Sequence, residues 1–302
     1  MIIAKLQGGL GNQMFQYAFG RALAKRRGVE LKLDATMFPT YKYHKLMISH
    51  LNISAPFASD KEVARFAFYR RRPNWPWKVL NPFLFDPEKY VQEISSYFSH
   101  DMLNLKAPCL VDGYWLCEKY FLDIEDIVRN EFTIRSPLNE YSKRMEEKIC
   151  SAEHPVMLHV RRGNFTTAFA PMHGALSSAY YERALSIIRE RVPNASYFIF
   201  SDDPEWARAH IRPDAKAEYI SQGADFDYLD LYLMTLCKNF ILAHSTFSWW
   251  GAWLGKSYRN NITIMPKYMT TKMDTRNLAH PSWKILEDTE WSARSNLAAK
   301  WN

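Results

Sequence analysis

Hydrophobic and polar positions along the first 35 residues predict a strand, a helix and a second strand. Residues 1–7 form an apolar run typical of a buried strand, and the glycine-rich segment 8–11 predicts a tight turn. Apolar residues then recur at helical spacing within 12–27, at Phe15, Ala18, Phe19, Ala22 and Leu23. Residues 29–33 predict the next strand. This order of elements is the opening of an open α/β sheet.

The second half of the chain alternates short apolar runs with helical patterns. Strands are predicted at 156–160, 196–200, 217–220, 239–243 and 261–265. Helices are predicted near 178–191, 204–210, 227–237 and 248–254. Such alternation is typical of a parallel sheet with helices on both faces. The predicted fold class is therefore α/β, with two Rossmann-like units in tandem.

The middle of the chain is less regular. Residues 36–110 are rich in aromatic and basic side chains, most densely at 70–78, and are interpreted as an insertion. A domain boundary is predicted at 151–155, which gives two domains, 1–150 and 151–302. The length of 302 residues suits two domains of about 150 residues each.

Composition narrows the class of protein only partly. Hydrophobic residues make up 47% and charged residues 24%, which excludes a disordered chain. The net charge of +7 would attract nucleic acid, an anionic membrane or a nucleotide diphosphate, without choosing among them. The scattered cysteines indicate neither zinc nor disulfides. Because no leader and no apolar run of about 20 residues is present, a cytoplasmic protein is predicted.

Polar and glycine residues follow four of the predicted strands. They are the segments 8–13, 159–164, 201–203 and 244–248. In open parallel sheets, ligands bind beyond the carboxyl ends of the strands. We therefore expect these segments, which come from both domains, to converge on one cleft.

The first glycine turn resembles a dinucleotide-binding fingerprint. Gly9 and Gly11 follow a strand, and Asp34 ends the next strand, where a ribose-binding acid would stand. Position 14, however, is Met14 instead of the third glycine. An NAD-dependent oxidoreductase is the main rival interpretation.

Two side-chain amides, Asn12 and Gln13, stand where the first helix is predicted to begin. They favour a contact with a sugar or a phosphate. The alternative is an ordinary glycine turn with Asn12 as the helix cap, and the sequence leaves both open.

The segment His159-Val160-Arg161-Arg162-Gly163-Asn164 is chemically the most informative. Packing is a poor explanation for two adjacent arginines after a buried strand, because charged side chains are rarely buried without a partner. Guanidinium groups match phosphate oxygens bidentately and stay charged. A solvated loop or an ion pair to carboxylates remains an equal alternative.

Hydroxyl groups and a predicted helix start coincide at Ser245, Thr246, Phe247 and Ser248. The positive end of a helix dipole together with hydroxyl groups predicts an anion site. The alternative is that Ser248 or Thr246 only caps the helix while the following tryptophans fill the core, and both can hold at once.

Two pairs of acidic residues each have a functional and a structural interpretation. Asp202 and Asp203 could accept hydrogen bonds from a guanine edge or ribose hydroxyls, or could cap the helix near residue 204. Asp225 and Asp227 have the Asp-x-Asp form that holds a divalent ion, but their setting after a glycine favours a capping segment. Among the histidines, His159 and His173 are the candidates for function.

Taken together, these motifs resemble those of the bacterial alpha-1,2-fucosyltransferases over residues 1 to about 266. The matching segments are 8–18, His159-x-Arg161-Arg162, 200–203 with Trp206, Asp230 with Leu233, Met234 and Cys237, and 245–250. The resemblance implies a GT-B fold of two facing Rossmann-like domains and inversion at the anomeric carbon without a metal.

The resemblance also implies GDP-β-L-fucose as donor, held mainly by the second domain, with the first domain shaping the acceptor side. The implied reaction transfers L-fucose to O2 of a terminal galactose in an oligosaccharide or lipid-linked glycan. Arg161, Arg162 and His159 are the expected catalytic residues. Donor-binding residues are expected at Gly9, Gly11, Asn12, Gln13, Arg161, Arg162, Asp202, Asp203, Ser245, Thr246, Phe247 and Ser248. No metal, no other cofactor and no nucleic-acid partner is expected. A peripheral contact with the inner face of a membrane is expected.

Two departures from the family pattern matter. Asn164 stands where relatives often have Asp, and His244 where they often have Asn, so the catalytic base is left unidentified. Besides the NAD-dependent enzyme, a basic module that binds nucleic acid or a membrane surface is a third interpretation, based on the charge and on residues 70–78.

Overall fold

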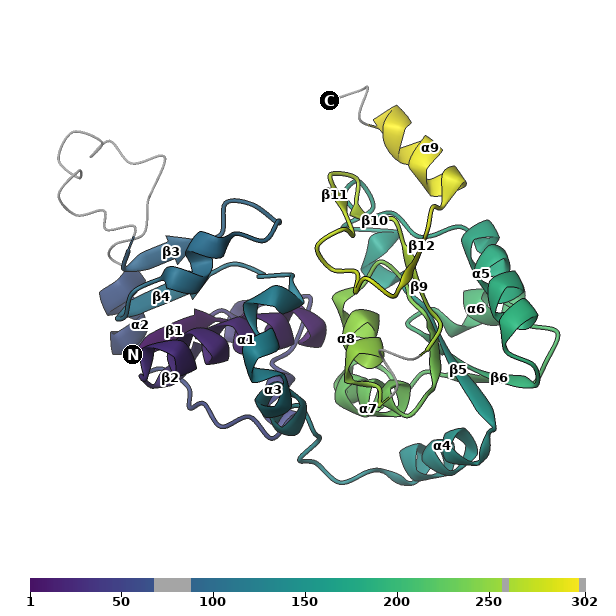
Figure 1. Ribbon diagram of the computed structural model, residues 1–302, viewed down its shortest axis with the longest axis horizontal. Helices are drawn as coiled ribbons and strands as arrows, with labels where there is room; N and C mark the ends of the chain where they lie inside the picture. Colours follow the sequence, from purple (N-terminus) through teal and green to yellow (C-terminus); the bar gives the residue numbers. More distant parts are fainter. Residues whose placement is uncertain (68–87, 257–260, 299–302) are drawn as a thin grey trace. The chain divides into compact units, whose positions relative to one another are not determined.

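The computed structural model describes residues 1–67, 88–256 and 261–298 (Figure 1). It divides the chain into two compact units, Met1–Arg135 and Ser136–Asn302. The division lies before the expected segment 151–155, because helix α4 (Glu140–Ser151) is bound to the second unit. Tyr232 donates a hydrogen bond to Glu146 of α4, and Lys148 forms an ion pair of 2.5 Å with Glu218.

The first unit is built on a four-stranded parallel sheet in the order β2-β1-β4-β3. Its strands are β1 (Ile2–Lys5), β2 (Leu31–Asp34), β3 (Tyr90–Gln92) and β4 (Cys109–Asp112). Its helices are α1 (Leu10–Arg27), α2 (Asp60–Ala67) and α3 (Glu125–Glu131). The long apolar face of α1 lies against β1 and β2 and is buried, as the helical spacing of its apolar residues predicts.

The interpretation of residues 36–110 as an insertion is wrong in part. Strand β3 lies in this range and β4 begins in it, and β4 pairs with β1 in the interior of the sheet. Strands of three and four residues are too short to display a periodic pattern among so many aromatic neighbours. The basic stretch 70–78 lies outside the described residues.

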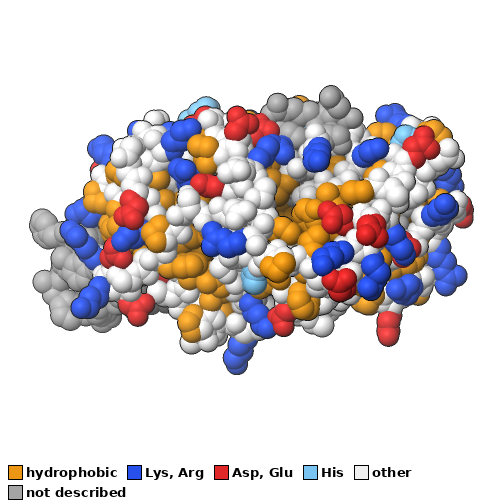
Figure 2. Space-filling view, turned by 90° about the horizontal axis from the view of Figure 1, so that it is seen from below, with side chains coloured by type: hydrophobic (Ala, Val, Ile, Leu, Met, Phe, Trp, Pro, Cys, Tyr) orange, Lys and Arg blue, Asp and Glu red, His pale blue; other side chains and the backbone are white. Residues whose placement is uncertain are grey.

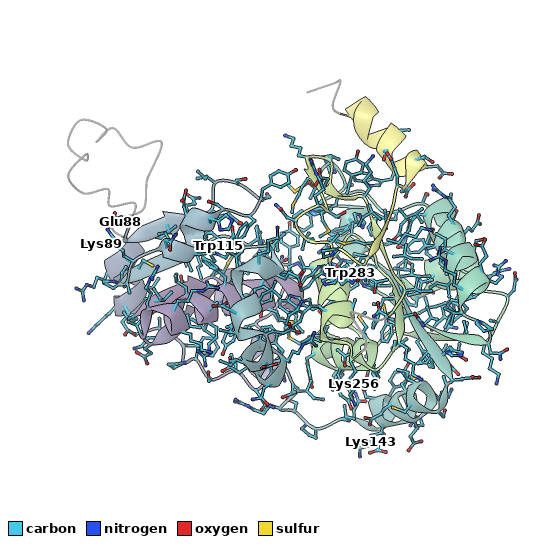
Figure 3. The ribbon with its side chains drawn as sticks, viewed as in Figure 1. Glu88, Lys89, Trp115, Lys143, Lys256 and Trp283 are labelled. Atoms are coloured by element: carbon cyan, nitrogen blue, oxygen red, sulfur yellow. The ribbon has the colours of Figure 1, made fainter. Side chains whose placement is uncertain are left out.

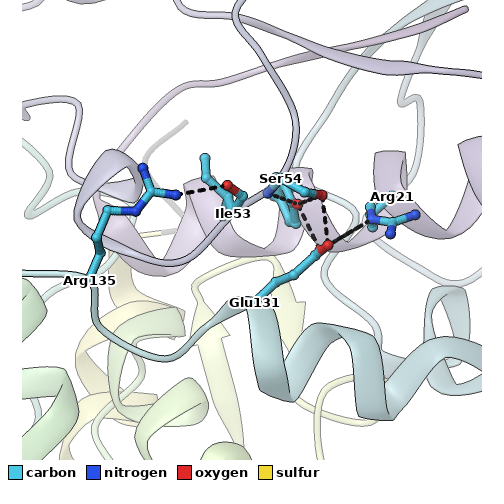
Figure 4. Close-up of polar contacts among 6 residues, drawn as sticks. Arg21, Ile53, Ser54, Glu131 and Arg135 are labelled. Carbon is cyan, nitrogen blue, oxygen red and sulfur yellow. Dashed lines mark hydrogen bonds and ion pairs between the residues drawn. The ribbon is translucent and has the colours of Figure 1, made fainter.

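Polar contacts hold the C-terminal residues of the first unit against the rest of that unit (Figure 4). Glu131, at the end of α3, accepts hydrogen bonds from the Tyr17 and Ser54 hydroxyls at 2.7 Å each and pairs with Arg21 at 3.2 Å. Arg135 donates to the carbonyl oxygen of Ile53 at 3.2 Å. These contacts tie the last residues of the unit back to α1 and to the segment after β2.

The second unit is built on a six-stranded parallel sheet in the order β12-β9-β8-β5-β6-β7. Its strands are β5 (His154–Val160), β6 (Ala195–Ser201), β7 (Ala217–Ile220), β8 (Asn239–Ile241), β9 (Thr263–Pro266) and β12 (Lys284–Leu286). A hairpin of β10 (Tyr268–Thr270) and β11 (Met273–Asp274) follows β9. The strand order reverses between β5 and β8, which is the topological switch point of the sheet.

Helices cover both faces of this sheet (Figure 1). Helices α5 (Ser178–Arg191) and α6 (Pro204–His210) lie on one side, and α7 (Asp227–Thr235) and α8 (Thr246–Leu254) on the other. The chain ends in α9 (Thr289–Ala298). Side chains of β5 alternate between the faces, so Val156, Leu158 and Val160 enter the core beneath α5. The predicted α/β fold with two Rossmann-like units is confirmed.

Three tryptophans of α8 anchor this helix in the second unit. Trp249, Trp250 and Trp253 are fully buried. The indole of Trp249 donates to the carbonyl oxygen of Leu278 at 2.6 Å, and its ring lies 5.9 Å from that of Trp283 (Figure 3). The core-filling role considered for these residues is confirmed, and it fixes where α8 begins.

Candidate functional site

The switch point of the second sheet gathers most of the predicted site residues. Arg161 and Arg162 directly follow β5, and His244 and Ser245 follow β8. The two segments touch, because the rings of His159 and Phe247 lie 5.8 Å apart. Switch points are where open α/β sheets bind ligands, so this edge of the sheet is the candidate site.

Two aspartates after β6 hold the arginine pair. Arg161 forms an ion pair of 2.7 Å with Asp202, and Arg162 one of 3.1 Å with Asp203. The backbone N–H of Arg162 also donates to Asp202 at 2.8 Å. The alternative of an ion pair to carboxylates is therefore correct, and both guanidinium groups are fixed at the edge while remaining partly exposed.

Asp203 also caps helix α6, as one of its two interpretations predicted. Its second carboxylate oxygen accepts from the backbone N–H of Trp206 at 3.1 Å. Asp202 and Asp203 thus have protein partners that orient the arginines. The direct contact with a nucleotide expected for them stays a prediction.

Aromatic faces complete the support of the arginines. The guanidinium carbon of Arg161 lies 5.2 Å from the ring centre of Phe165, and that of Arg162 lies 4.1 Å from the ring centre of Trp206. Such cation–π contacts restrict the planes of the guanidinium groups. Sequence reasoning missed Phe165, whose only signal is its place four residues after Arg161 in the same loop.

The loop after β5 has no room for a side chain at Gly163. A Cβ atom there would lie 2.4 Å from the carboxylate Oδ2 of Asp202, the atom that pairs with Arg161. This glycine is therefore required by the ion pair.

Two histidines lie buried beneath the arginines. Burial, with smaller contributions from Arg161 and His244, lowers the pKa of His159 to about 3. Burial also lowers the pKa of His244 to about 4, although its Nε2–H donates to the carbonyl oxygen of Gly174 at 2.6 Å. Both rings are therefore neutral near pH 7. Only 5% of His159 is exposed, so its ring packs beneath the arginines, and the catalytic role expected for it stays a prediction.

The third histidine, His173, shares an aromatic neighbour with Arg161. Its ring stacks on Phe165 at 4.2 Å, with an angle of 5° between the planes. Its Nδ1 lies 3.2 Å from the carbonyl oxygen of Met269, which fixes the proton on that nitrogen. Burial lowers the pKa of His173, and Arg161 lowers it further.

The start of helix α8 faces the same edge. Ser245 is the N-cap and accepts from the backbone N–H of Phe247 at 3.3 Å. Thr246 and Phe247 are partly exposed at the positive end of the helix dipole. The expected ligand contact of Ser248 is corrected, because its hydroxyl is fully buried and donates to the carbonyl oxygens of Ala243 and Ser245.

In the first unit, the glycine turn has a different structure from the one expected. Helix α1 begins at Leu10 with Gly9 as N-cap, so Asn12 is not the cap. Gly8 has a φ of +76°, in the region that favours glycine, and the Asn12 side chain lies against it.

The amide of Gln13 is not available to a ligand, which corrects its expected role. The side chain is fully buried. Its Nε2 donates to the carbonyl oxygens of Gly8 and Lys45 at 2.9 and 2.8 Å, and its Oε1 accepts from the N–H groups of Met47 and Ile48 at 3.0 and 3.1 Å. All four hydrogen-bonding positions of the amide are thus used, three to hold the segment 45–48 and one to hold Gly8.

The acid of the dinucleotide interpretation, Asp34, is also engaged within the protein. It is buried, and its Oδ1 accepts from the N–H and the hydroxyl of Thr36 at 2.9 and 2.6 Å. This turn contact replaces the ribose contact that an NAD-dependent enzyme would need.

The capping interpretation of Asp225 and Asp227 is wrong. The N-cap of α7 is Phe226, and no side chain caps the helix there, because a preceding 3₁₀ turn supplies the contacts. Burial and the neighbouring Asp230 raise the pKa of Asp227 to about 7. Within residues 1–67, 88–256 and 261–298, no group of three His, Cys, Asp or Glu side chains is arranged to hold a metal ion.

Basic and acidic side chains are interspersed on the face of the molecule that Figure 2 shows. Among the helices of the described residues, none is long and apolar enough to cross a membrane. The contact with a membrane face and the cytoplasmic location stay predictions.

The chain is similar to known glycosyltransferases over most of its length. The model of the family described as "Glycosyl transferase family 11" matches residues 1–287. The alpha-1,2-colitosyltransferase of Escherichia coli is 33% identical over 285 residues, which cover 88% of this chain and 91% of that protein. The galactoside alpha-(1,2)-fucosyltransferase 1 of Bos taurus is 26% identical over 277 residues, covering 85% of this chain and 68% of that protein.

A solved structure supports the fold. A mutant of Arabidopsis thaliana FUT1 in complex with GDP superposes with a TM-score of 0.55 at 13% identity, covering 92% of this chain and 74% of the other. The expected resemblance to the fucosyltransferases is confirmed, and the two other interpretations, an oxidoreductase and a basic binding module, find no support. The chain belongs to glycosyl transferase family 11.

Proposed function

We propose that this chain transfers L-fucose from GDP-β-L-fucose to O2 of a terminal galactose in a glycan, with inversion at the anomeric carbon. The observation that carries the proposal is the pair Arg161 and Arg162, fixed by Asp202 and Asp203 at the switch point beside the start of α8. The family match and the names of the relatives support a GDP-sugar donor.

The reaction needs fixed positive charge at the departing diphosphate. The bond between the fucosyl anomeric carbon and the phosphate oxygen breaks, and the acceptor oxygen forms its bond on the opposite face of the sugar. The acceptor hydroxyl releases its proton in the same reaction, so the products are the fucosylated glycan, GDP and one proton. Negative charge grows on the leaving GDP, so donors already aimed at that charge stabilise the transition state most.

The ion pairs leave the arginines suited to this task. Asp202 takes Nη1 of Arg161, and Asp203 takes Nε of Arg162. A guanidinium group has five N–H donors, so each side chain keeps further donors for phosphate oxygens. We assign the diphosphate to these donors together with the positive end of α8, and we propose that no metal ion is required.

We assign the donor to the second unit and the acceptor to the first. The second unit carries the fixed cations, whereas the polar side chains of the first glycine turn are engaged within the protein. The acceptor glycan of the proposal is galactose-terminated.

Colitose is the second candidate for the transferred sugar, because one relative is named an alpha-1,2-colitosyltransferase. Colitose is fucose without its 3-hydroxyl group. A site that hydrogen-bonds this hydroxyl would reject the deoxy sugar by about 10⁴-fold, while an apolar site would reject the hydroxyl by only about 10²-fold.

The test compares kcat/KM for GDP-fucose and GDP-colitose with methyl β-D-galactoside as acceptor, and the linkage of the product is determined by NMR. We expect GDP-fucose to be preferred and the new bond to be at O2. Methyl 2-deoxy-β-D-galactoside is the matched control and should not react. A preference for GDP-colitose would contradict the assigned sugar, and transfer to the 2-deoxy acceptor would contradict the assigned linkage.

A further inference from the structure

Aromatic side chains gather at the carboxyl edge of the first sheet. Tyr41 lies 6.1 Å from Tyr43 and 5.9 Å from His44, measured between ring centres, in the segment that follows β2. Tyr114 follows β4 by two residues. Strands β2 and β4 flank β1 in the sheet, so the loops that follow them lie on either side of the glycine turn after β1.

A strained turn presents Tyr114 at this edge. The next residue, Trp115, has a φ of +55°, a left-handed conformation that is unfavourable for a residue with a side chain. Its ring is buried and stacks on Phe19 at 4.2 Å, with an angle of 21° (Figure 3). Such conformations persist where the surroundings enforce them, and they cluster at binding sites.

The Glu93 carboxylate enforces the turn from its other side. It accepts from the backbone N–H groups of Tyr114 and Trp115 at 2.6 and 3.1 Å. A Cβ atom at Gly113 would lie 2.3 Å from the Cβ of Glu93, so only glycine fits there. Trp115 is held in the core, whereas 41% of Tyr114 remains exposed.

The segment that carries His44 is fixed as well. The side-chain amide of Gln13, through its hydrogen bonds, holds residues 45–48 against α1. The His44 ring lies 3.4 Å from where a Cβ of Gly9 would stand, so it covers the glycine turn after β1. Aromatic rings from the loops after β2 and β4 thus lie at the carboxyl edge of the first sheet. Hydrogen bonds and packing within the protein hold both loops in place.

We propose that Tyr41, Tyr43, His44 and Tyr114 form a subsite that stacks a sugar ring of the acceptor glycan. Flat aromatic rings suit the C–H faces of an uncharged sugar, and a site of aromatic side chains with few polar groups is typical of small-ligand recognition. The proposal rests on the proposed function, because it assigns the acceptor side of that reaction to these residues.

The test measures binding of methyl β-D-galactoside to the full chain by ligand-observed NMR, with GDP present. Tyr114→Ala should weaken binding up to about tenfold, the usual range for loss of an aromatic stacking partner. Tyr114→Phe should bind as the unaltered chain does. Tyr97→Ala is the matched control, because Tyr97 is in the same unit and is also 41% exposed.

Melting curves with and without GDP separate this proposal from the proposed donor. Weaker galactoside binding by Tyr114→Ala, with normal stabilisation by GDP and no effect of Tyr97→Ala, supports the subsite. Unchanged binding by Tyr114→Ala, an equal loss in Tyr97→Ala, or no binding by the unaltered chain would overturn it. Galactoside binding that depends on Tyr114 in a chain that GDP does not stabilise would keep the subsite and contradict the donor.

Discussion

The two sheets of this protein share a parallel topology and differ in the chemistry of their carboxyl edges. The edge of the second sheet carries two arginines in ion pairs with aspartates, above buried neutral histidines. The edge of the first sheet carries aromatic rings, and its polar side chains, such as Gln13 and Glu93, bind the protein's own backbone.

This difference indicates a division of labour. Fixed cations are suited to an anion whose charge grows during the reaction, and aromatic rings are suited to an uncharged sugar. The glycine turn, which in the sequence looks like the nucleotide site, lies in the unit that the structure makes less suitable for a phosphate.

The largest expected effect is the loss of an arginine from the second edge. Arg161→Ala or Arg162→Ala should lower turnover by about 10²- to 10³-fold, because a donor aimed at developing charge is lost. Arg162→Lys should restore little, since an ammonium group cannot reproduce the bidentate fork. Turnover of each variant is measured beside its melting curve. If the alanine variants fold and keep most of their turnover, the two arginines do not stabilise the leaving group.

A smaller effect is expected from displacing the partner of the arginines. In Gly163→Ala the new methyl group must push the Asp202 carboxylate away, because it would otherwise lie 2.4 Å from Oδ2. We expect turnover to fall roughly tenfold, by about 1.4 kcal/mol, which is less than for the arginine variants. The Arg161→Ala, Gly163→Ala double variant is the control. Independent, multiplying losses would show that Gly163 does not act through Arg161.

A third effect concerns pH and the half-buried Asp227. Its pKa is about 7 in the folded chain and about 4 when unfolded, so the folded state binds more protons between these values and stability falls as pH rises through this range. Asp227→Asn removes this loss. Its melting temperature relative to the unaltered chain should therefore rise from pH 4 to pH 7 and then level off. A difference that does not depend on pH would show that the carboxyl group is not buried as described.

The smallest expected effect is that of a chelator. If arginines supply the positive charge, turnover should be unchanged in excess EDTA. Loss of activity with recovery on adding manganese or magnesium would instead assign Asp225 and Asp227 to a metal site.

Much of the fold and part of the site could be predicted from the sequence. The apolar runs of β5 to β9 alternate with helical patterns and so stand out along the chain, and the placement of Arg161, Asp202 and Ser245 at strand ends followed from it. Strands β3 and β4 were missed because their short apolar runs do not stand out in a stretch rich in aromatic and basic side chains.

Side-chain partners could not be predicted, because they depend on contacts between distant segments. Gln13 and Ser248 lie near helix starts, where ligand-binding residues are common. Only the fold shows that their side chains form hydrogen bonds with backbone groups instead. The clamp of Glu93 on Tyr114 spans 21 residues and leaves no local pattern.

Thermal stabilisation by nucleotides tests the central claim most directly, because a ligand that binds only the folded state must raise its melting temperature. The account predicts that GDP raises the melting temperature with increasing concentration, that Arg161→Ala and Arg162→Ala reduce this rise, and that NAD has no effect. Stabilisation by NAD and not by GDP, or a GDP effect that neither arginine variant alters, would contradict the account.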